Sequence, residues 1–157
     1  MSDDGASRFV QPDPYNLARF VDAQAMSYDR ALRELRHGAK TSHWMWFIFP
    51  QVAGLSTSAM SRRYAIRSSA EAAAYLAHPL LGPRLRECAV ALLAHTHRSA
   101  REILGEPDDA KLRSSATLFA DIDGDGPFTR LLAHFFAGAR DEMTIRLLRA
   151  ADGRQAP

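Results

Sequence analysis

The stretch Trp44-Met45-Trp46-Phe47-Ile48-Phe49, followed by Pro50, is apolar at every position. A helix built from it has no polar face to present to water, so it must be nearly surrounded by protein. Thr41 or Ser42 can cap its first turn, and Pro50 prevents its extension because the residue before a proline is driven out of the helical region. The sequence therefore predicts a short, buried helix at this point of the chain.

The composition extends this prediction to the whole chain. Ala and Leu are abundant whereas Val, Ile and Thr are scarce, which favours helices over strands. A length of 157 residues fits one domain with a hydrophobic core. We expect an all-α fold, a single compact orthogonal helical domain of about seven to nine helices, several of them short.

Start and stop signals divide the chain into these helices. Asp13 opens the first helix and Gly38 ends it, while the Ser-x-x-Glu pairs at 68–71 and 99–102 match capping boxes. The expected helices cover roughly 13–37, 41–49, 58–66, 68–77, 81–96, 99–105, 107–119, 127–136 and 141–149. The expected organisation is a flexible N-terminal arm over 1–12, a single helical domain over 13–150 and a flexible C-terminal tail over 151–157.

Several classes of protein are disfavoured by composition. No apolar run reaches the length of about 18 residues that a membrane span needs, and residues 1–4 are acidic, unlike a secretory signal. We therefore expect a cytoplasmic protein with no membrane association. The net charge of +2 is small and the basic residues are scattered, which argues against a nucleic-acid partner. Cys88, the single cysteine, has no partner for an intrachain disulfide.

The acidic loop 121–126 imitates the start of a calcium loop, with oxygen donors at alternate positions and a glycine at the sixth. Its twelfth position is Leu132, so the bidentate carboxylate is missing and an Asp/Gly turn that caps the next helix is favoured. His95 and His97 lie two apart on a predicted helix, and their side chains diverge too far to chelate one ion. We expect no metal and no cofactor.

Polar groups bracket the central aromatic block, and two interpretations of this arrangement remain open. In the first, Trp44 and Trp46 stack on a planar ligand, His43 serves as acid, base or donor, and Gln51 supplies a specific hydrogen bond. In the second, the block is a core helix in which His43 bonds a nearby carbonyl. Arg62, which follows the block, belongs to an arginine pair that offers an anion-binding edge, although such pairs are ordinary on surfaces.

Lysine is rare in this chain and arginine is common. The two lysines, Lys40 and Lys111, fall in the two segments richest in polar and aromatic residues. A retained lysine marks a place that needs a compact ammonium group rather than a planar guanidinium. Helical spacing aligns Asp108, Lys111 and Ser115 on one side, with Ser114 close to the same side. The alternative is a solvated helix face that carries an Asp–Lys pair.

Six short motifs follow one another along the chain: Ser42-His43-Trp44-Met45-Trp46-Phe47-Ile48-Phe49-Pro50-Gln51, Tyr64-Ala65-Ile66, His78-Pro79-Leu80-Leu81-Gly82, Arg84-Leu85, Asp108 with Lys111-Leu112, and Ser114-Ser115. With these motifs the chain resembles the domain of unknown function 1810 family, a mostly bacterial set, from about Tyr15 to Leu148. The resemblance implies a mainly helical domain and brings no established activity. The calpastatin label sometimes given to the family implies a charged, extended chain, which a content of 46% hydrophobic residues contradicts. Ala116 departs from the family pattern, in which we expect Met.

These observations lead to one hypothesis with a second kept beside it. We expect the segments 40–51 and 108–115 to line one pocket for a small polar ligand, nucleotide-like or phosphorylated. Metal-independent hydrolysis or group transfer there would use His43 and Asp108 for proton transfer. The expected ligand-binding residues are Lys40, Trp44, Trp46, Gln51, Lys111, Ser114 and Ser115. The alternative is a non-enzymatic protein-interaction or homodimerisation module with no small-molecule ligand.

Overall fold

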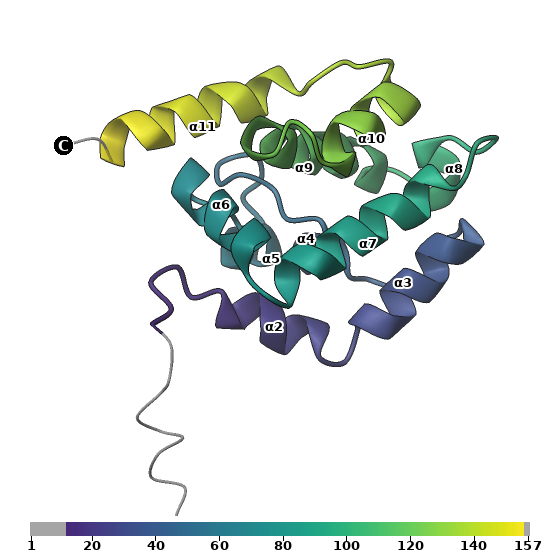
Figure 1. The fold of residues 1–157 in the computed structure, drawn as a ribbon, viewed down its shortest axis with the longest axis horizontal. Helices are drawn as coiled ribbons and strands as arrows, with labels where there is room; N and C mark the ends of the chain where they lie inside the picture. Colours follow the sequence, from purple (N-terminus) through teal and green to yellow (C-terminus); the bar gives the residue numbers. More distant parts are fainter. Residues whose placement is uncertain (1–11, 156–157) are drawn as a thin grey trace, which may run out of the picture.

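The computed structural model describes residues 12–155, and this part of the chain is all-helical (Figure 1). It contains ten helices and no strand, apart from one isolated parallel bridge between Val52 and Ile66. The all-α prediction is confirmed, with slightly more helices than expected. None of these helices is long and apolar enough to span a membrane. The helices are α2 (Ala18–Gln24), α3 (Tyr28–His37), α4 (Met45–Ile48), α5 (Ala59–Arg63), α6 (Ser69–Ala77), α7 (Leu81–Leu93), α8 (Ala100–Leu104), α9 (Asp108–Ile122), α10 (Pro127–Phe136) and α11 (Glu142–Gln155).

Local signals set several of the helix ends. The Ser99 side chain accepts from the backbone N–H of Glu102, and the Glu102 carboxylate accepts from Ser99, which completes the predicted capping box of α8. Ser68 caps α6 through the Glu71 N–H, but the Glu71 carboxylate turns to other partners, so that box is only half formed. Gly38 ends α3 at φ 77°, a left-handed conformation that glycine adopts without strain.

The long first helix expected over 13–37 is divided in two. The helix α2 ends at Gln24 and α3 begins at Tyr28, with the chain turning through Met26, which is 91% exposed. The turn lets α2 pack against α4 while α3 packs against α7, which one straight helix cannot do. Gln24 is buried at this junction, where its amide donates to the Phe47 carbonyl over 2.8 Å.

The flexible tail expected over 151–157 is helical through Gln155. A tertiary contact explains the difference, because the Asp152 carboxylate accepts from the backbone N–H of Ser69 at 2.9 Å and from its hydroxyl at 2.5 Å. Ala151 is buried beside it. The end of α11 is thereby attached to the start of α6, 83 residues earlier in the chain. Of the arm expected over 1–12, residues 1–11 lie outside the described part.

The core is held together by a row of aromatic rings that crosses four helices. Phe20, Tyr75, Phe119 and Phe128 follow one another with ring centroids 5.0, 5.5 and 5.5 Å apart. All four are essentially inaccessible to water. The helices α6 and α7 approach so closely that a Cβ at Gly82 would lie 2.1 Å from the carbonyl oxygen of Leu76. Close packing of this kind fixes the position of α7 relative to α6.

A buried carboxylate fixes the approach to α4. Glu34, on α3, accepts hydrogen bonds from the backbone N–H groups of Thr41 and Ser42, from the Ser42 hydroxyl and from the Trp44 indole. Burial opposes ionisation of this carboxyl group, but the four donors outweigh it and lower the pKa of Glu34 from 4.5 to about 2. The charged form of Glu34 therefore stabilises the folded protein at neutral pH.

We predict that Glu34→Gln lowers the free energy of unfolding by about 3 kcal/mol at pH 7, because a neutral amide accepts these bonds less strongly. The folded-state pKa is depressed, so the contribution of Glu34 is complete above its ordinary pKa of 4.5 and declines as the pH falls toward about 2. The difference between wild type and variant should shrink across that window in urea titrations. Glu142→Gln, at an exposed position, is the control and should change stability by no more than about 0.5 kcal/mol. A pH-independent difference between wild type and Glu34→Gln would contradict the assignment.

Candidate functional site

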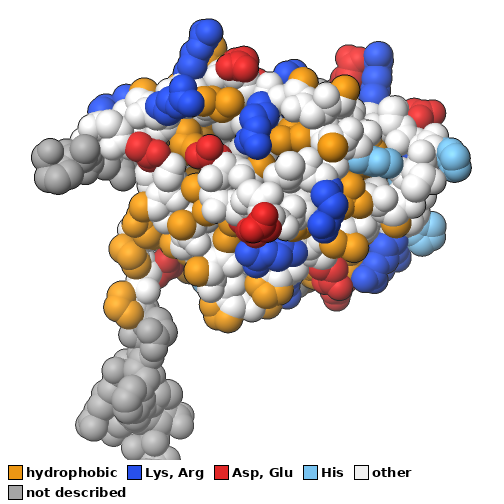
Figure 2. Space-filling view, turned by 45° about the horizontal axis from the view of Figure 1, so that its top comes forward, with side chains coloured by type: hydrophobic (Ala, Val, Ile, Leu, Met, Phe, Trp, Pro, Cys, Tyr) orange, Lys and Arg blue, Asp and Glu red, His pale blue; other side chains and the backbone are white. Residues whose placement is uncertain are grey.

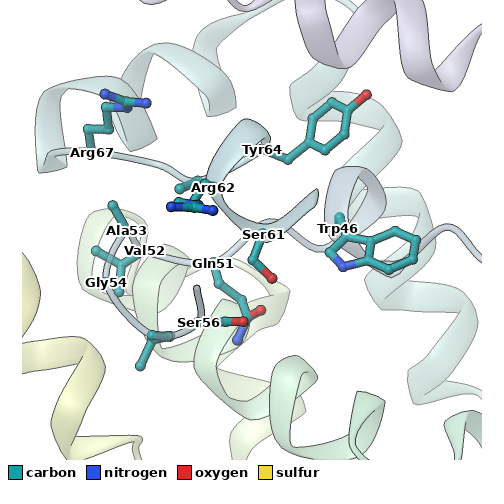
Figure 3. Close-up of a pocket in the computed structure, with 12 residues that line it drawn as sticks. Trp46, Gln51, Val52, Ala53, Gly54, Ser56, Ser61, Arg62, Tyr64 and Arg67 are labelled. Carbon is teal, nitrogen blue, oxygen red and sulfur yellow. The ribbon is translucent and has the colours of Figure 1, made fainter. Parts of the chain in front are cut away.

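A cavity of about 250 Å³ lies beside Trp46, where the chain passes from α4 into the segment that carries α5 (Figure 3). Its wall combines an aromatic ring, an amide, hydroxyl groups and guanidinium groups. In Figure 3 the Gln51 side chain extends toward Ser56, and the indole of Trp46 lies at one edge of the lining residues. The polar and aromatic lining residues are Trp46, Gln51, Ser56, Ser61, Arg62, Tyr64 and Arg67.

Backbone pairing gives this irregular segment a fixed shape. The N–H of Ile66 donates to the Gln51 carbonyl at 2.9 Å, and the N–H of Ala53 donates to the Ile66 carbonyl at 2.8 Å. These two bonds close the loop from 51 to 66 at its base. Within the loop, Ser58 caps α5 through the N–H of Ser61, and the two hydroxyl groups lie 2.9 Å apart. The cavity is therefore bounded by a loop tied at both ends.

Several polar groups of the wall have no protein partner within residues 12–155. No hydrogen bond or ion pair there involves the Gln51 amide, the Trp46 indole N–H or the guanidinium groups of Arg62 and Arg67. Groups of this kind are solvated in the free protein and are available to a ligand. Two guanidinium groups favour an anion, and the indole offers an apolar plane. The cavity can therefore hold a small anionic molecule that has a planar part.

Both lysines and both tryptophans of the chain meet around one carboxylate. The Lys40 ammonium lies 2.8 Å from Oδ2 of Asp108 and 5.0 Å from the centre of the Trp44 ring. The Lys111 ammonium lies 3.8 Å from Oδ1 of Asp108 and 5.5 Å from the centre of the Trp46 ring. We call these five residues the lysine cluster. It brings the two segments singled out in the sequence, 40–51 and 108–115, into contact.

The lysine cluster and the cavity share Trp46 but differ in character. The side chains of Lys40 and Asp108 are 9% and 17% exposed, so their ion pair is largely removed from water. Trp44 is buried, and its indole N–H is occupied by Glu34. Trp46 is only partly buried and is the tryptophan that lines the cavity. The cluster thus contacts the wall of the cavity through Trp46, which lines the space together with Gln51.

The other predicted residues are placed differently. The Ser114 hydroxyl donates to the Ala110 carbonyl at 3.2 Å and to the Asp141 carboxylate at 3.0 Å, which links α9 to the segment leading into α11. The Ser115 hydroxyl is buried and has no partner in the described part of the chain. His43 is exposed, and no hydrogen bond joins it to Asp108 within residues 12–155. Neither serine lines the cavity beside Trp46.

Most of the cavity wall could not be selected from the sequence. Ser56, Ser61 and Arg67 lie in or next to a loop without a periodic pattern, and only the bridge at Ile66 brings them together. One signal was present, the exposed arginine pair that includes Arg62, but an arginine pair without a known neighbour is not specific. The fold brings Trp46, Gln51 and Arg67 into the same cavity wall as Arg62.

Fold and site together define an all-α protein with a small, partly basic cavity beside a buried aromatic helix. The chain matches the family described as "Protein of unknown function (DUF1810)" over residues 14–148, and it belongs to this family. It is similar to the conserved hypothetical protein Rv1873 from Mycobacterium tuberculosis, whose crystal structure superimposes with a TM-score of 0.85. The two chains are 51% identical over 87% of this chain and 99% of that one. No curated protein matches the chain.

We predict that Asp108→Asn lowers the free energy of unfolding by about 2 kcal/mol, because it leaves the largely buried ammonium of Lys40 without its counter-charge. Asp109→Asn is the matched control in the same first turn of α9. Within residues 12–155 the Asp109 carboxylate accepts only from the neighbouring N–H of Ala110, and its loss should change stability by about 0.5 kcal/mol. Urea unfolding of both variants measures the difference.

A double-variant cycle with Lys40→Met isolates the ion pair. The combined Lys40→Met and Asp108→Asn variant should lose less stability than the sum of the two single variants, because neither group is then left unpaired. Additive losses, or equal losses for Asp108→Asn and Asp109→Asn, would show that the pair carries no energy of its own.

Proposed function

We propose that this protein binds a small anionic ligand with a planar part, a phosphorylated or nucleotide-like molecule, in the cavity beside Trp46. One observation carries the proposal: Arg62 and Arg67, whose guanidinium groups have no protein partner within residues 12–155, line a space of about 250 Å³ together with Trp46 and Gln51. Ligand pockets combine an apolar surface with a few directional polar groups in this way. The ligand charge would be met by the arginines and its planar part by Trp46.

The position of Trp46 supports this assignment. Lys111 lies 5.5 Å from the centre of its ring and is itself 3.8 Å from Asp108. A cation and the face of an aromatic ring attract each other, and this attraction restricts the orientation of the ring. A preorganised wall loses less conformational entropy when a ligand is bound. Lys111 therefore acts in this proposal through Trp46 rather than by contact with the ligand.

The surface charge is compatible with a small ligand. On the face shown in Figure 2, the Lys and Arg side chains are spread among acidic, polar and apolar ones instead of forming one continuous stripe. An extended polyanion requires such a stripe, because its affinity comes from many phosphate contacts. The net charge of only +2 agrees with this view. A local pair of arginines is suited to one charged group.

The proposal is one of binding and includes no catalytic step. Both oxygens of Asp108 face lysine ammonium groups, so this carboxylate is engaged before any ligand arrives. His43 has no partner in the described chain that would orient its ring. A general acid or base acts only from a position that fixes its distance to the proton. For this reason Trp46, Gln51, Arg62 and Arg67 carry the proposed function.

We predict that AMP raises the melting temperature of the wild-type protein by about 5 °C or more at a hundredfold excess over its Kd. Trp46→Leu and Arg62→Ala should each remove most of this rise, because they delete the planar wall and one charged group. Thermal shift with AMP, glucose 6-phosphate and orthophosphate measures the effect, each variant being compared with its own ligand-free melting temperature.

Arg130→Ala is the control, since Arg130 is exposed on α10 and lines none of the cavities described. It should keep the full AMP effect. An equal loss in Arg62→Ala and Arg130→Ala would reduce the effect to nonspecific charge. No rise with any of the three compounds, together with a concentration-dependent dimer in sedimentation, would favour the alternative of a homodimerisation module.

A further inference from the structure

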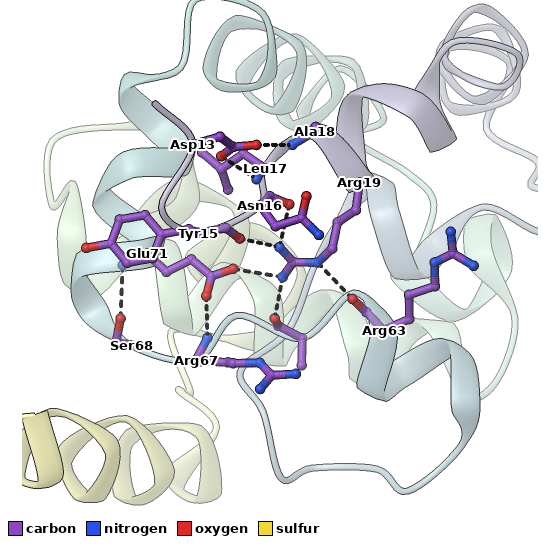
Figure 4. A network of polar contacts seen from close by, with 11 residues as sticks. Asp13, Tyr15, Asn16, Leu17, Ala18, Arg19, Arg63, Arg67, Ser68 and Glu71 are labelled. Carbon is purple, nitrogen blue, oxygen red and sulfur yellow. Dashed lines mark hydrogen bonds and ion pairs between the residues drawn. The ribbon is translucent and has the colours of Figure 1, made fainter. Parts of the chain in front are cut away.

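A second hollow of about 460 Å³ lies next to the cavity beside Trp46, and Arg67 lines both. Its wall is formed by the segment that leads into α2 with the first turn of that helix, and by the chain from the end of α5 to the first turn of α6. Figure 4 shows the groups around it, with the Arg19 guanidinium in the middle and the side chains of Arg63 and Arg67 on different sides of it. Arg62 lines only the first space and Arg63 only the second.

The acidic group of the second hollow is already neutralised. The Glu71 carboxylate lies 2.8 Å from the Arg19 guanidinium, and its other oxygen accepts from the Arg67 N–H at 3.1 Å. Arg19 is fully engaged as well, since its nitrogens also donate to four backbone carbonyls. In the described part of the chain no ion pair involves the side chains of Arg63 and Arg67, which also line this hollow, so it favours an anion.

Arg63 lines the second hollow. Its guanidinium lies 5.5 Å from the centre of the ring of Tyr64, a residue that also belongs to the wall of the cavity beside Trp46. Its backbone carbonyl accepts from Arg19 at 2.8 Å, which fixes the position of the residue. Trp46, Arg62 and Arg67 therefore line the first space, and Arg67 and Arg63 line the second.

The size of the first cavity points to a ligand that occupies both spaces. A volume of about 250 Å³ is below the range of roughly 300–1,000 Å³ typical of pockets that enclose a whole ligand of drug size. A nucleotide placed with its base against Trp46 must extend beyond the first cavity, and Arg67 lines both this cavity and the second hollow. The proposed function is the premise of this step.

We infer that the ligand carries two consecutive phosphoryl groups, as a nucleoside diphosphate or its ester does. The planar part contacts Trp46, the first phosphoryl group lies between Arg62 and Arg67, and the second lies between Arg67 and Arg63. Guanidinium groups bind phosphoryl oxygens through paired, charge-assisted hydrogen bonds, so each additional contact raises affinity. A monophosphate contacts only Arg62 and Arg67.

The test compares ADP with AMP on wild type, Arg62→Ala, Arg63→Ala and Arg130→Ala by isothermal titration calorimetry. Wild type should bind ADP about tenfold or more tightly than AMP. Arg62→Ala should weaken both nucleotides by similar factors. Arg63→Ala should weaken ADP about tenfold more than AMP, removing the preference. Arg130→Ala controls for the loss of one surface charge and should retain the preference.

The outcomes separate this inference from the proposed function. Binding of AMP and ADP with equal affinity by wild type would overturn the two-phosphoryl ligand and leave the cavity beside Trp46 as a monophosphate site. A preference for ADP that survives in Arg63→Ala would also overturn it, since the second group would then be bound elsewhere. Failure of both nucleotides to bind wild type would overturn the proposed function and this inference together.

Discussion

The structure depends first on the buried carboxylate of Glu34. A charge in the interior is tolerated only when hydrogen bonds replace the water it has lost, and Glu34 obtains four of them from Thr41, Ser42 and Trp44. All four donors belong to one turn of the chain. The turn therefore stabilises the charge of Glu34, and the charge in turn holds the turn in its conformation. A helix as apolar as α4 has no polar face to orient it, and this turn gives it a defined entry.

The same turn places the neighbouring groups of the site. Lys40 precedes it and reaches Asp108, the first residue of α9, at 2.8 Å, while its backbone N–H donates to the Ile103 carbonyl over the same distance. Trp46 follows it, between Lys111 and the cavity. A change at Glu34 is therefore expected to reach the cavity through covalently adjacent residues, because closely packed elements transmit displacement.

The sequence predicted what local chemistry determines and missed what tertiary contacts determine. Gly38 and the Ser99–Glu102 box act within one turn of helix, and both were found. The break after Gln24 has no local stop signal and arises because α2 and α3 pack against different helices. The helical continuation to Gln155 depends on a bond from Ser69, far away in the chain. The cavity needs the Gln51–Ile66 pairing, for which no periodic pattern exists.

The lysines of the lysine cluster and the arginines of the cavity have different surroundings. Lys40 is held between a carboxylate oxygen and the Trp44 ring, in a position only 9% exposed, where a compact ammonium fits. Arg62 and Arg67 line an open space, where a planar group with five donors reaches more ligand atoms than an ammonium does. Both lysines thus join separate segments of the protein, as Arg19 also does through Glu71 and four backbone carbonyls. The guanidinium groups of Arg62 and Arg67, by contrast, have no protein partner among the described residues and are available to a ligand.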